Sequence, residues 1–163
     1  MPPRRLLTIG VYGFDEATFY AALTGAGAAE LVDIRRRRGV RGPQYAFANA
    51  KRLEAGLAEH GIAYRHELGL AAPAELIAAE GEADRRAGHA RRERAHLSPE
   101  FVAGFAEVLA GAEAQAALAG IAPAERPPAL LCVEAVPEAC HRSLVAAALA
   151  RVHPDAVVVH LTP

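Results

Sequence analysis

The stretch PALLCVEAVPEACHRSLVAAALARVHPDAVVVHL, residues 128–161, predicts an apolar strand, a helix and a second apolar strand in succession. Its first segment, PALLCVEA, and its last, DAVVVHL, are apolar runs without helical spacing, which is typical of strands buried on both faces. The segment between them, CHRSLVAAALARV, predicts a helix. Strands separated by helices in this way predict a parallel sheet that is covered on both sides.

The beginning of the chain has the same organisation. We expect an apolar strand at 4–12 and then a helix, capped by Asp15, that runs through about Ala26. A second apolar strand at 29–35 ends abruptly in charged residues. The next predicted elements are an irregular loop at 36–46, a helix at 47–61 and a third strand at 62–68.

Residues from about 73 to 120 predict a helical insertion, because they are too many for one ordinary crossover. Their first part is rich in alanine and in charge. Ser98, Pro99 and Glu100 then form a typical start for a helix through about Leu118. We expect the insertion to form a cap or an interface. The whole pattern predicts a single α/β domain over residues 1–163, with three layers and a mostly parallel, Rossmann-like sheet of about five strands with helices on both faces.

The composition of the chain argues against some classes of partner and identifies none. The chain has 163 residues, 52% of them hydrophobic, and 18 basic residues nearly balance 19 acidic ones. The net charge of −1 indicates no polyanionic partner by itself. Since no apolar run approaches membrane-spanning length, we expect a cytoplasmic protein without a membrane partner. Two cysteines cannot form a disulfide scaffold, and the oligomeric state is left open.

The position of a candidate site follows from the predicted sheet. In open parallel sheets, ligands bind beyond the carboxyl ends of the strands, where loops and helix N-termini converge. The strand within PALLCVEA brings Cys132 and Glu134 to that edge, and the next helix is expected to begin near Pro137 to Cys140. Exposed N–H groups at the helix start favour an anion beside Cys140, His141 and Arg142. An arginine adds a bidentate fork for phosphate or carboxylate.

Two further strand ends should reach the same edge. Asp33 and Arg35 end the second strand, and Tyr12 follows the first. Ten of the 18 basic residues lie in the stretches 35–41 and 85–94, which indicates a local anionic ligand. The second stretch alternates with acidic residues, so a solvated helix face is the default interpretation of it.

These residues divide into two predicted roles, each with a structural alternative. The candidate catalytic groups are Glu134, Cys140 and Asp33. The candidate substrate-binding residues are Arg35, Arg142, His141, Cys132, Tyr12 and Arg41. The structural alternatives are a buried apolar Cys132, an inert Cys140, a Glu134 that only holds Arg142, an ion pair between Asp33 and Arg35, and a core position for Tyr12.

Metal binding is a separate question. Cys132, Cys140 and His141 could supply three ligands, but their spacing is not that of zinc fingers and a fourth ligand is unassigned. From the sequence we therefore assign no metal, and the cofactor is left open.

Four segments together resemble the domain of unknown function 488 family: TIGVYGF, LVDIRRRRGVRG, GIAYRHELG and LLCVEAVPEACHRSLVAAAL. The resemblance runs from about Thr8 to Leu149, and C-x-E followed by C-H-R is its most specific part. It implies a compact α/β domain and no particular reaction. The residues that it implies to be clustered are Cys132, Glu134, Cys140, His141, Arg142, Asp33 and Arg35.

The sequence departs from the usual family pattern in two places. Tyr12-Gly13 stands where serine or threonine is frequent, and Gly39-Val40-Arg41 stands where the family has P-x-S-R, so a ligand contact of that loop is altered. A looser likeness joins LVDIR and CHRS to rhodanese-type sulfurtransferases and related phosphatases, whose cysteine loop is shorter. This likeness is a fold-level analogy.

Three functions compete at this point. The leading hypothesis is an enzyme acting on a phosphate-containing small molecule or nucleic acid, with the anion held between Arg35 and the helix start at 140–142. It requires the guanidinium groups of Arg35 and Arg142 to face one hollow. The alternatives are a thiol-based sulfurtransferase or hydrolase that uses Cys140 or Cys132, and a non-catalytic module that binds nucleic acid through the two basic stretches.

Overall fold

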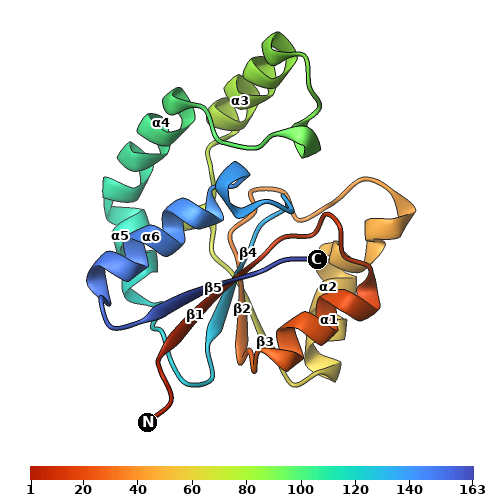
Figure 1. Ribbon diagram of the computed structural model, residues 1–163, viewed down its shortest axis with the longest axis vertical. Coiled ribbons are helices and arrows are strands. Elements are labelled where there is room, and N and C mark those ends of the chain that lie inside the picture. Colours follow the sequence, from red (N-terminus) through yellow and green to blue (C-terminus); the bar gives the residue numbers. More distant parts are fainter.

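The computed structural model describes residues 1–163 as a parallel sheet with helices on both sides (Figure 1). The strands are β1 (Arg5–Ile9), β2 (Glu30–Asp33), β3 (Ala63–His66), β4 (Pro128–Leu131) and β5 (Val157–Leu161). The helices are α1 (Glu16–Gly25), α2 (Ala50–Glu59), α3 (Ala74–Ala87), α4 (Pro99–Ala110), α5 (Ala112–Ala119) and α6 (Arg142–Val152). Short 3₁₀ turns are η1 (Pro43–Ala48), η2 (Leu68–Leu70), η3 (Arg91–Glu93) and η4 (Pro137–Ala139). The predicted α/β fold class is confirmed.

All five strands are parallel, in the order β3-β2-β4-β1-β5. β4 is the middle strand, and its Ala129 lies opposite both Leu7 of β1 and Leu31 of β2. Every residue of β4 is buried, which explains why this segment has no polar position. Because β4 lies between β1 and β2, the loop that follows it is flanked by the ends of both neighbours.

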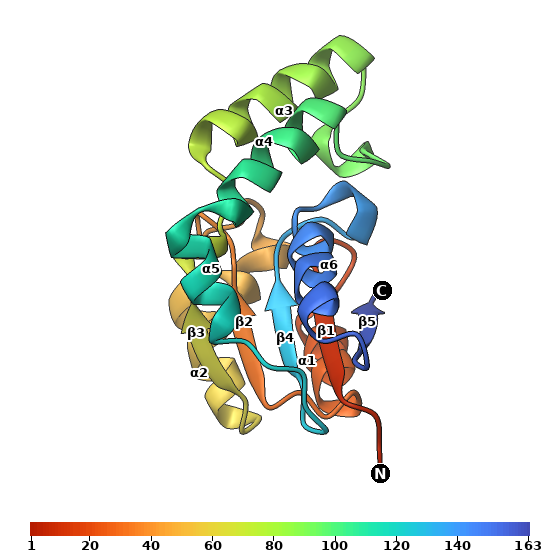
Figure 2. The ribbon, with the colours of Figure 1, turned by 90° about the vertical axis from the view of Figure 1, so that its left-hand side faces the viewer.

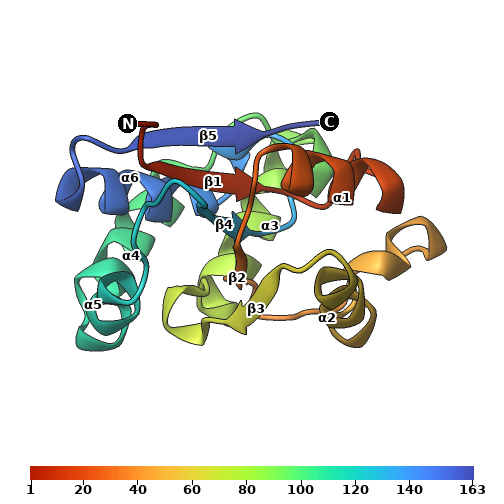
Figure 3. The same ribbon diagram turned by 90° about the horizontal axis from the view of Figure 1, so that it is seen from below.

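Helices cover both faces of the sheet (Figure 3). α1 and α2 pack on one face, where Phe19, Leu23 and Leu57 join the strand side chains in one apolar cluster. α4, α5 and α6 pack on the other face, with Phe105 and Val145 in a second cluster. The connections that leave β1 and β2 thus pass over one face, and the connection that leaves β4 passes over the other. Ligand sites of open α/β sheets lie where such connections diverge.

The predicted helical insertion extends beyond the carboxyl ends of the strands, where α3 and α4 pack against each other (Figure 2). The expected helix through about Leu118 is wrong in one respect, because the chain bends by 75° between α4 and α5. Gly111 is extended at the bend, and the Gln115 side-chain amide donates to the Leu109 carbonyl that the break leaves free. No single helix combines the length and apolarity needed to cross a membrane, and only the bent pair of α4 and α5, taken together, meets those criteria.

The elements at the carboxyl edge end at different residues from those predicted. β4 ends at Leu131, so Cys132 and Glu134 lie in the loop that follows. The chain then makes the turn η4, and α6 begins only at Arg142. The loop after β2, expected to be irregular, contains η1, which begins at Pro43 because the fixed φ of proline suits the first position of a helical turn.

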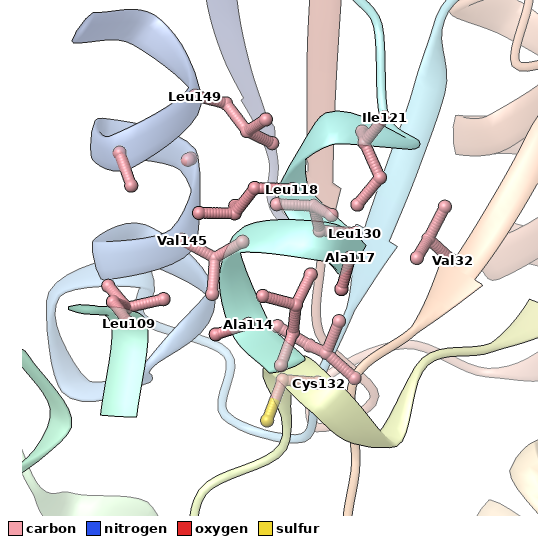
Figure 4. Packing of buried hydrophobic residues seen from close by; sticks show 14 of the residues in the cluster. Val32, Leu109, Ala114, Ala117, Leu118, Ile121, Leu130, Cys132, Val145 and Leu149 are labelled. Atoms are coloured by element: carbon pink, nitrogen blue, oxygen red, sulfur yellow. The ribbon is translucent and has the colours of Figure 1, made fainter. Parts of the chain in front are cut away.

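Cys132 lies at the boundary between the core and this edge. It belongs to the apolar cluster beneath α4, α5 and α6. Figure 4 shows it at the margin of that cluster, with its sulfur pointing away from Leu118 and Leu130. The residue therefore packs as an apolar side chain at its base while its sulfur faces the carboxyl edge.

Candidate functional site

A cleft of about 610 Å³ lies between the carboxyl edge of the sheet and the helical insertion. The loops after β1, β2 and β4 form one side of it, and α3, the start of α4 and the segment between them form the other. Its volume is in the range of sites for small ligands, roughly 300–1,000 Å³. Of the predicted site residues, only Asp33 and Arg142 are absent from its lining.

The two thiols and one imidazole form a compact group at the cleft. Cys132 Sγ, Cys140 Sγ and a ring nitrogen of His141 all lie within 4.8 Å of one another. Cys132 Sγ is 3.4 Å from His141 Nδ1, and His141 Nε2 is 3.1 Å from the Ile34 carbonyl oxygen. The three side chains are buried, and neither cysteine is in a disulfide. The chain thus brings the loop after β4 and the start of α6 against the end of β2.

The two thiols have opposite pKa shifts. Burial acts to raise the pKa of Cys140, but the hydrogen bond with Cys132, the neighbouring His141 and the positive charge of Arg142 outweigh it and hold this pKa well below its ordinary value. The hydrogen bond to Cys140 and burial together raise the pKa of Cys132 well above its ordinary value. Of the two thiols, Cys140 is therefore the one that loses its proton more readily.

Glu134 presents a carboxylate to the cleft and pairs there with Arg91 of η3. The Glu134 side chain is 4% exposed, whereas that of Arg91 is 48% exposed. Burial raises the pKa of the Glu134 carboxyl, and the positive charge of Arg91 acts against that rise. Arg142, the expected partner, contacts the backbone of Glu134 and not its carboxylate.

Asp33 and Arg35 form the buried ion pair that was one of the two interpretations of this strand end. Asp33 Oδ1 accepts from Arg35 Nε at 2.9 Å, and Asp33 Oδ2 accepts from Arg35 Nη2 at 2.8 Å. Tyr64 Oη also donates to Asp33 Oδ2 at 2.8 Å, and Arg35 Nη1 donates to the Ala48 carbonyl. Burial raises the pKa of Tyr64 to about 12, so this hydroxyl remains a donor. Every functional atom of Asp33 is thus occupied within the protein.

The expectation that the guanidinium groups of Arg35 and Arg142 share one hollow is wrong. Arg142 is fully buried and donates to the backbone carbonyls of Glu134 and Ala135 and to Thr8 Oγ1. It holds the loop after β4 against β1, where carbonyl groups and a hydroxyl satisfy its donors. Gly10 makes this approach feasible, because a Cβ atom there would lie 1.9 Å from the Glu134 carbonyl oxygen.

The outer part of the cleft carries the free positive charge. Arg36, Arg37 and Arg41 are exposed and line the cleft, and none of them is in an ion pair. Arg36 donates from Nε to the Ala72 carbonyl, which holds it between the loop and the insertion. Tyr12 is half-buried at the other side, with its ring 5.1 Å from that of Tyr45 in η1.

Sequence reasoning missed three charged side chains of this cleft. The pattern of residues 85–94 favours a solvated helix face, yet Arg91 and Arg94 both line the cleft, and Arg94 is held by Asp84 and by the Ala139 carbonyl. Glu80 is buried and accepts from the Ser98 N–H at 2.9 Å. The clustering of arginine in 85–94 was the one available signal, and it did not say which of the arginines turn inward.

The comparisons with known proteins agree with the family resemblance of the sequence. The model of the family described as "Domain of unknown function DUF488" matches residues 16–149, which include both strand-end motifs and the two cysteines. Neither a curated protein nor a solved structure matches the chain. Because the family model covers most of the chain, this protein belongs to the DUF488 family.

Proposed function

We propose that this protein is an enzyme that binds a small phosphate-type anion in the cleft at the carboxyl edge of the sheet. One observation carries the proposal: six arginines line the cleft, against only two carboxylates. The arginines are Arg35, Arg36, Arg37, Arg41, Arg91 and Arg94, and the carboxylates are Glu80 and Glu134. A concave site with an excess of one charge concentrates ligands of the opposite charge.

The ion pairs show which of these arginines keep a free positive charge. Arg35 and Arg94 are neutralised by carboxylates behind the cleft wall, Asp33 and Asp84. Arg36, Arg37 and Arg41 keep their charge for a ligand. Planar guanidinium groups bind phosphate and carboxylate oxygens in pairs, so the three can hold a multiply charged group. The apolar side chains of Val40 and Ile77 line the same cleft and suit a ligand with an uncharged portion.

We expect the ion pair between Arg91 and Glu134 to change when a ligand binds. Its guanidinium is half-exposed and pairs with Glu134, which is buried. A bound phosphate group competes with Glu134 for Arg91, because both present two oxygens to the same fork. In the complex the Glu134 carboxylate is then released toward the ligand, where it is the candidate acid or base of the reaction.

Calorimetric titration with inorganic pyrophosphate and with a nucleoside diphosphate tests the proposal. The double variant Arg37→Gln/Arg41→Gln should lower the affinity for both probes by at least about tenfold, since it removes two charge-assisted contacts. The matched control is Arg86→Gln/Arg92→Gln, which removes the same charge from exposed positions outside the cleft. The control should bind as the native protein does.

Three results would count against the proposal. The native protein could bind neither probe. Both double variants could lose affinity equally, which would show that general surface charge attracts the anion. A single-stranded oligonucleotide could bind far more tightly than either small anion with a steep salt dependence, which would favour the nucleic-acid-binding alternative.

A further inference from the structure

We propose that Cys132, Cys140 and His141 form a binding site for a divalent transition metal of the zinc class, with an open coordination position that faces the cleft. This inference differs from the sequence-based expectation of no metal. It is independent of the proposed anion-binding function.

The distances between the three side chains suit a tetrahedral metal. Zinc binds thiolate sulfur at about 2.3 Å and imidazole nitrogen at about 2.1 Å, so sulfur and nitrogen ligands of one tetrahedral ion lie about 3.6 Å apart. Cys132 Sγ and His141 Nδ1 are 3.4 Å apart. All three ligand atoms, including Cys140 Sγ, lie within 4.8 Å of one another. Small side-chain rotations would therefore close the site around an ion.

The hydrogen bond of the imidazole selects the nitrogen that a metal needs. The Ile34 carbonyl oxygen can only accept, so His141 Nε2 carries the proton and donates to it at 3.1 Å. In the neutral ring Nδ1 is then unprotonated, and its lone pair faces the Cys132 sulfur. Metal-binding histidines generally donate their other N–H in this way, to a carbonyl or a carboxylate.

The surroundings hold the three ligands in place before a metal arrives. Arg142 ties the loop after β4 to β1, because it donates to two backbone carbonyls of the loop and to Thr8 Oγ1 of β1. The three ligands are at most 7% exposed. The His141 ring also packs edge-on against Phe105, with ring centres 5.1 Å apart. Two thiolates balance the charge of a divalent ion, so the occupied site is neutral and tolerates burial.

The ligand types decide the class of metal, and their number decides the kind of site. Two sulfurs and one imidazole nitrogen favour zinc or similar ions over magnesium or calcium, which prefer oxygen. Structural zinc sites have four protein ligands, whereas catalytic sites have three and keep one position for water or substrate. All three ligands here line the cleft, and so does Glu134, two residues from Cys132. The fourth position therefore opens to the cleft.

Cobalt(II) titration of the reduced native protein tests the site. We expect one cobalt per chain, the charge-transfer absorption of thiolate-bound cobalt, and the visible bands of a tetrahedral ion. Zinc should displace the cobalt, and magnesium should not. Cys132→Ser, Cys140→Ser and His141→Asn should each weaken metal binding by at least about 100-fold, given that loss of second-shell partners alone costs 10-fold to 100-fold.

His96→Asn is the matched control, because His96 is exposed and does not line the cleft. It should leave the cobalt spectrum unchanged. If the ligand variants do not fold, alkylation of the thiols of the native protein with and without zinc tests the same site. We expect zinc to protect both cysteines. Any of three results would overturn the proposal. The folded native protein could lack thiolate-to-cobalt absorption, the folded ligand variants could keep an unaltered spectrum, or zinc could fail to protect the thiols.

Discussion

Replacing Asp33 by asparagine tests the claim that its buried ion pair with Arg35 stabilises the protein. The carboxylate accepts four hydrogen bonds: from Arg35 Nε, Arg35 Nη2, the Arg35 backbone N–H and Tyr64 Oη. The side chains of Asp33 and Arg35 are 0% and 1% exposed. An asparagine keeps one acceptor oxygen and turns an NH₂ group toward donors, so the guanidinium stays buried without its counter-charge.

The expected loss of stability follows from these contacts. Breaking a buried pair by neutralising one partner costs about 3–5 kcal/mol, because the remaining charge is left without compensation. Losing two hydrogen bonds to a charged group, at about 1.5–3 kcal/mol each, gives about 3–6 kcal/mol, which overlaps that range. The free energy of unfolding, measured by urea denaturation, should fall by that amount. The double variant Asp33→Asn/Arg35→Met should recover part of the loss, since it removes the unpaired charge.

The exposed pair of Arg52 and Glu16 is the matched control. These side chains are 56% and 45% exposed, so Glu16→Gln should cost at most about 1 kcal/mol. An Asp33→Asn variant that loses no more stability than Glu16→Gln would refute the reasoning. So would an equally large loss in both variants, because burial would then not be the deciding factor.

Two other perturbations have definite expected outcomes. Gly10→Ala places a Cβ 1.9 Å from the Glu134 backbone oxygen and should destabilise the protein by about 3 kcal/mol. Gly25→Ala is the control, because a Cβ there meets open space, and it should be nearly neutral. Thermal unfolding of both variants measures the difference. The hydrogen bonds from Arg94 lower the pKa of Asp84 below its ordinary value of 3.8, although burial acts to raise it. The stability that this pair contributes is therefore present at neutral pH and is lost as the pH falls through the lowered pKa. The stability difference between the native protein and Asp84→Asn should therefore be constant above about pH 5 and shrink in acid, and a difference that grows in acid would contradict the sign of this shift.

Part of the candidate site could be predicted because chain order and burial determine it locally. A parallel strand buried on both faces has to be a continuous apolar run, and the first polar residues after such a run mark its carboxyl end. The first polar residues after β4 and β2 are Glu134 and Arg35, and both line the cleft. The C-x-E and C-H-R patterns also predict the family, which the match of the family model over residues 16–149 confirms.

The direction of each side chain could not be predicted in the same way. Arg35 and Arg142 have the same chemistry and both follow or begin an element at the correct edge. One is neutralised by Asp33, and the other faces three oxygen acceptors beneath the loop after β4. Sequence spacing determines which edge of the sheet a residue reaches. Packing then determines where the flexible end of its side chain points.

The amino-acid sequence by itself determined the strands, their parallel arrangement and the edge at which chemistry gathers, because these follow from runs of apolar residues and from the helical segments that alternate with them. Only the tertiary structure decided which partners meet. Arg91 reaches Glu134 across 43 residues, and His141 reaches the Ile34 carbonyl across 107. Such contacts depend on how the helical insertion and the end of β2 pack against the loop after β4, and no local pattern encodes a partner that distant in the chain.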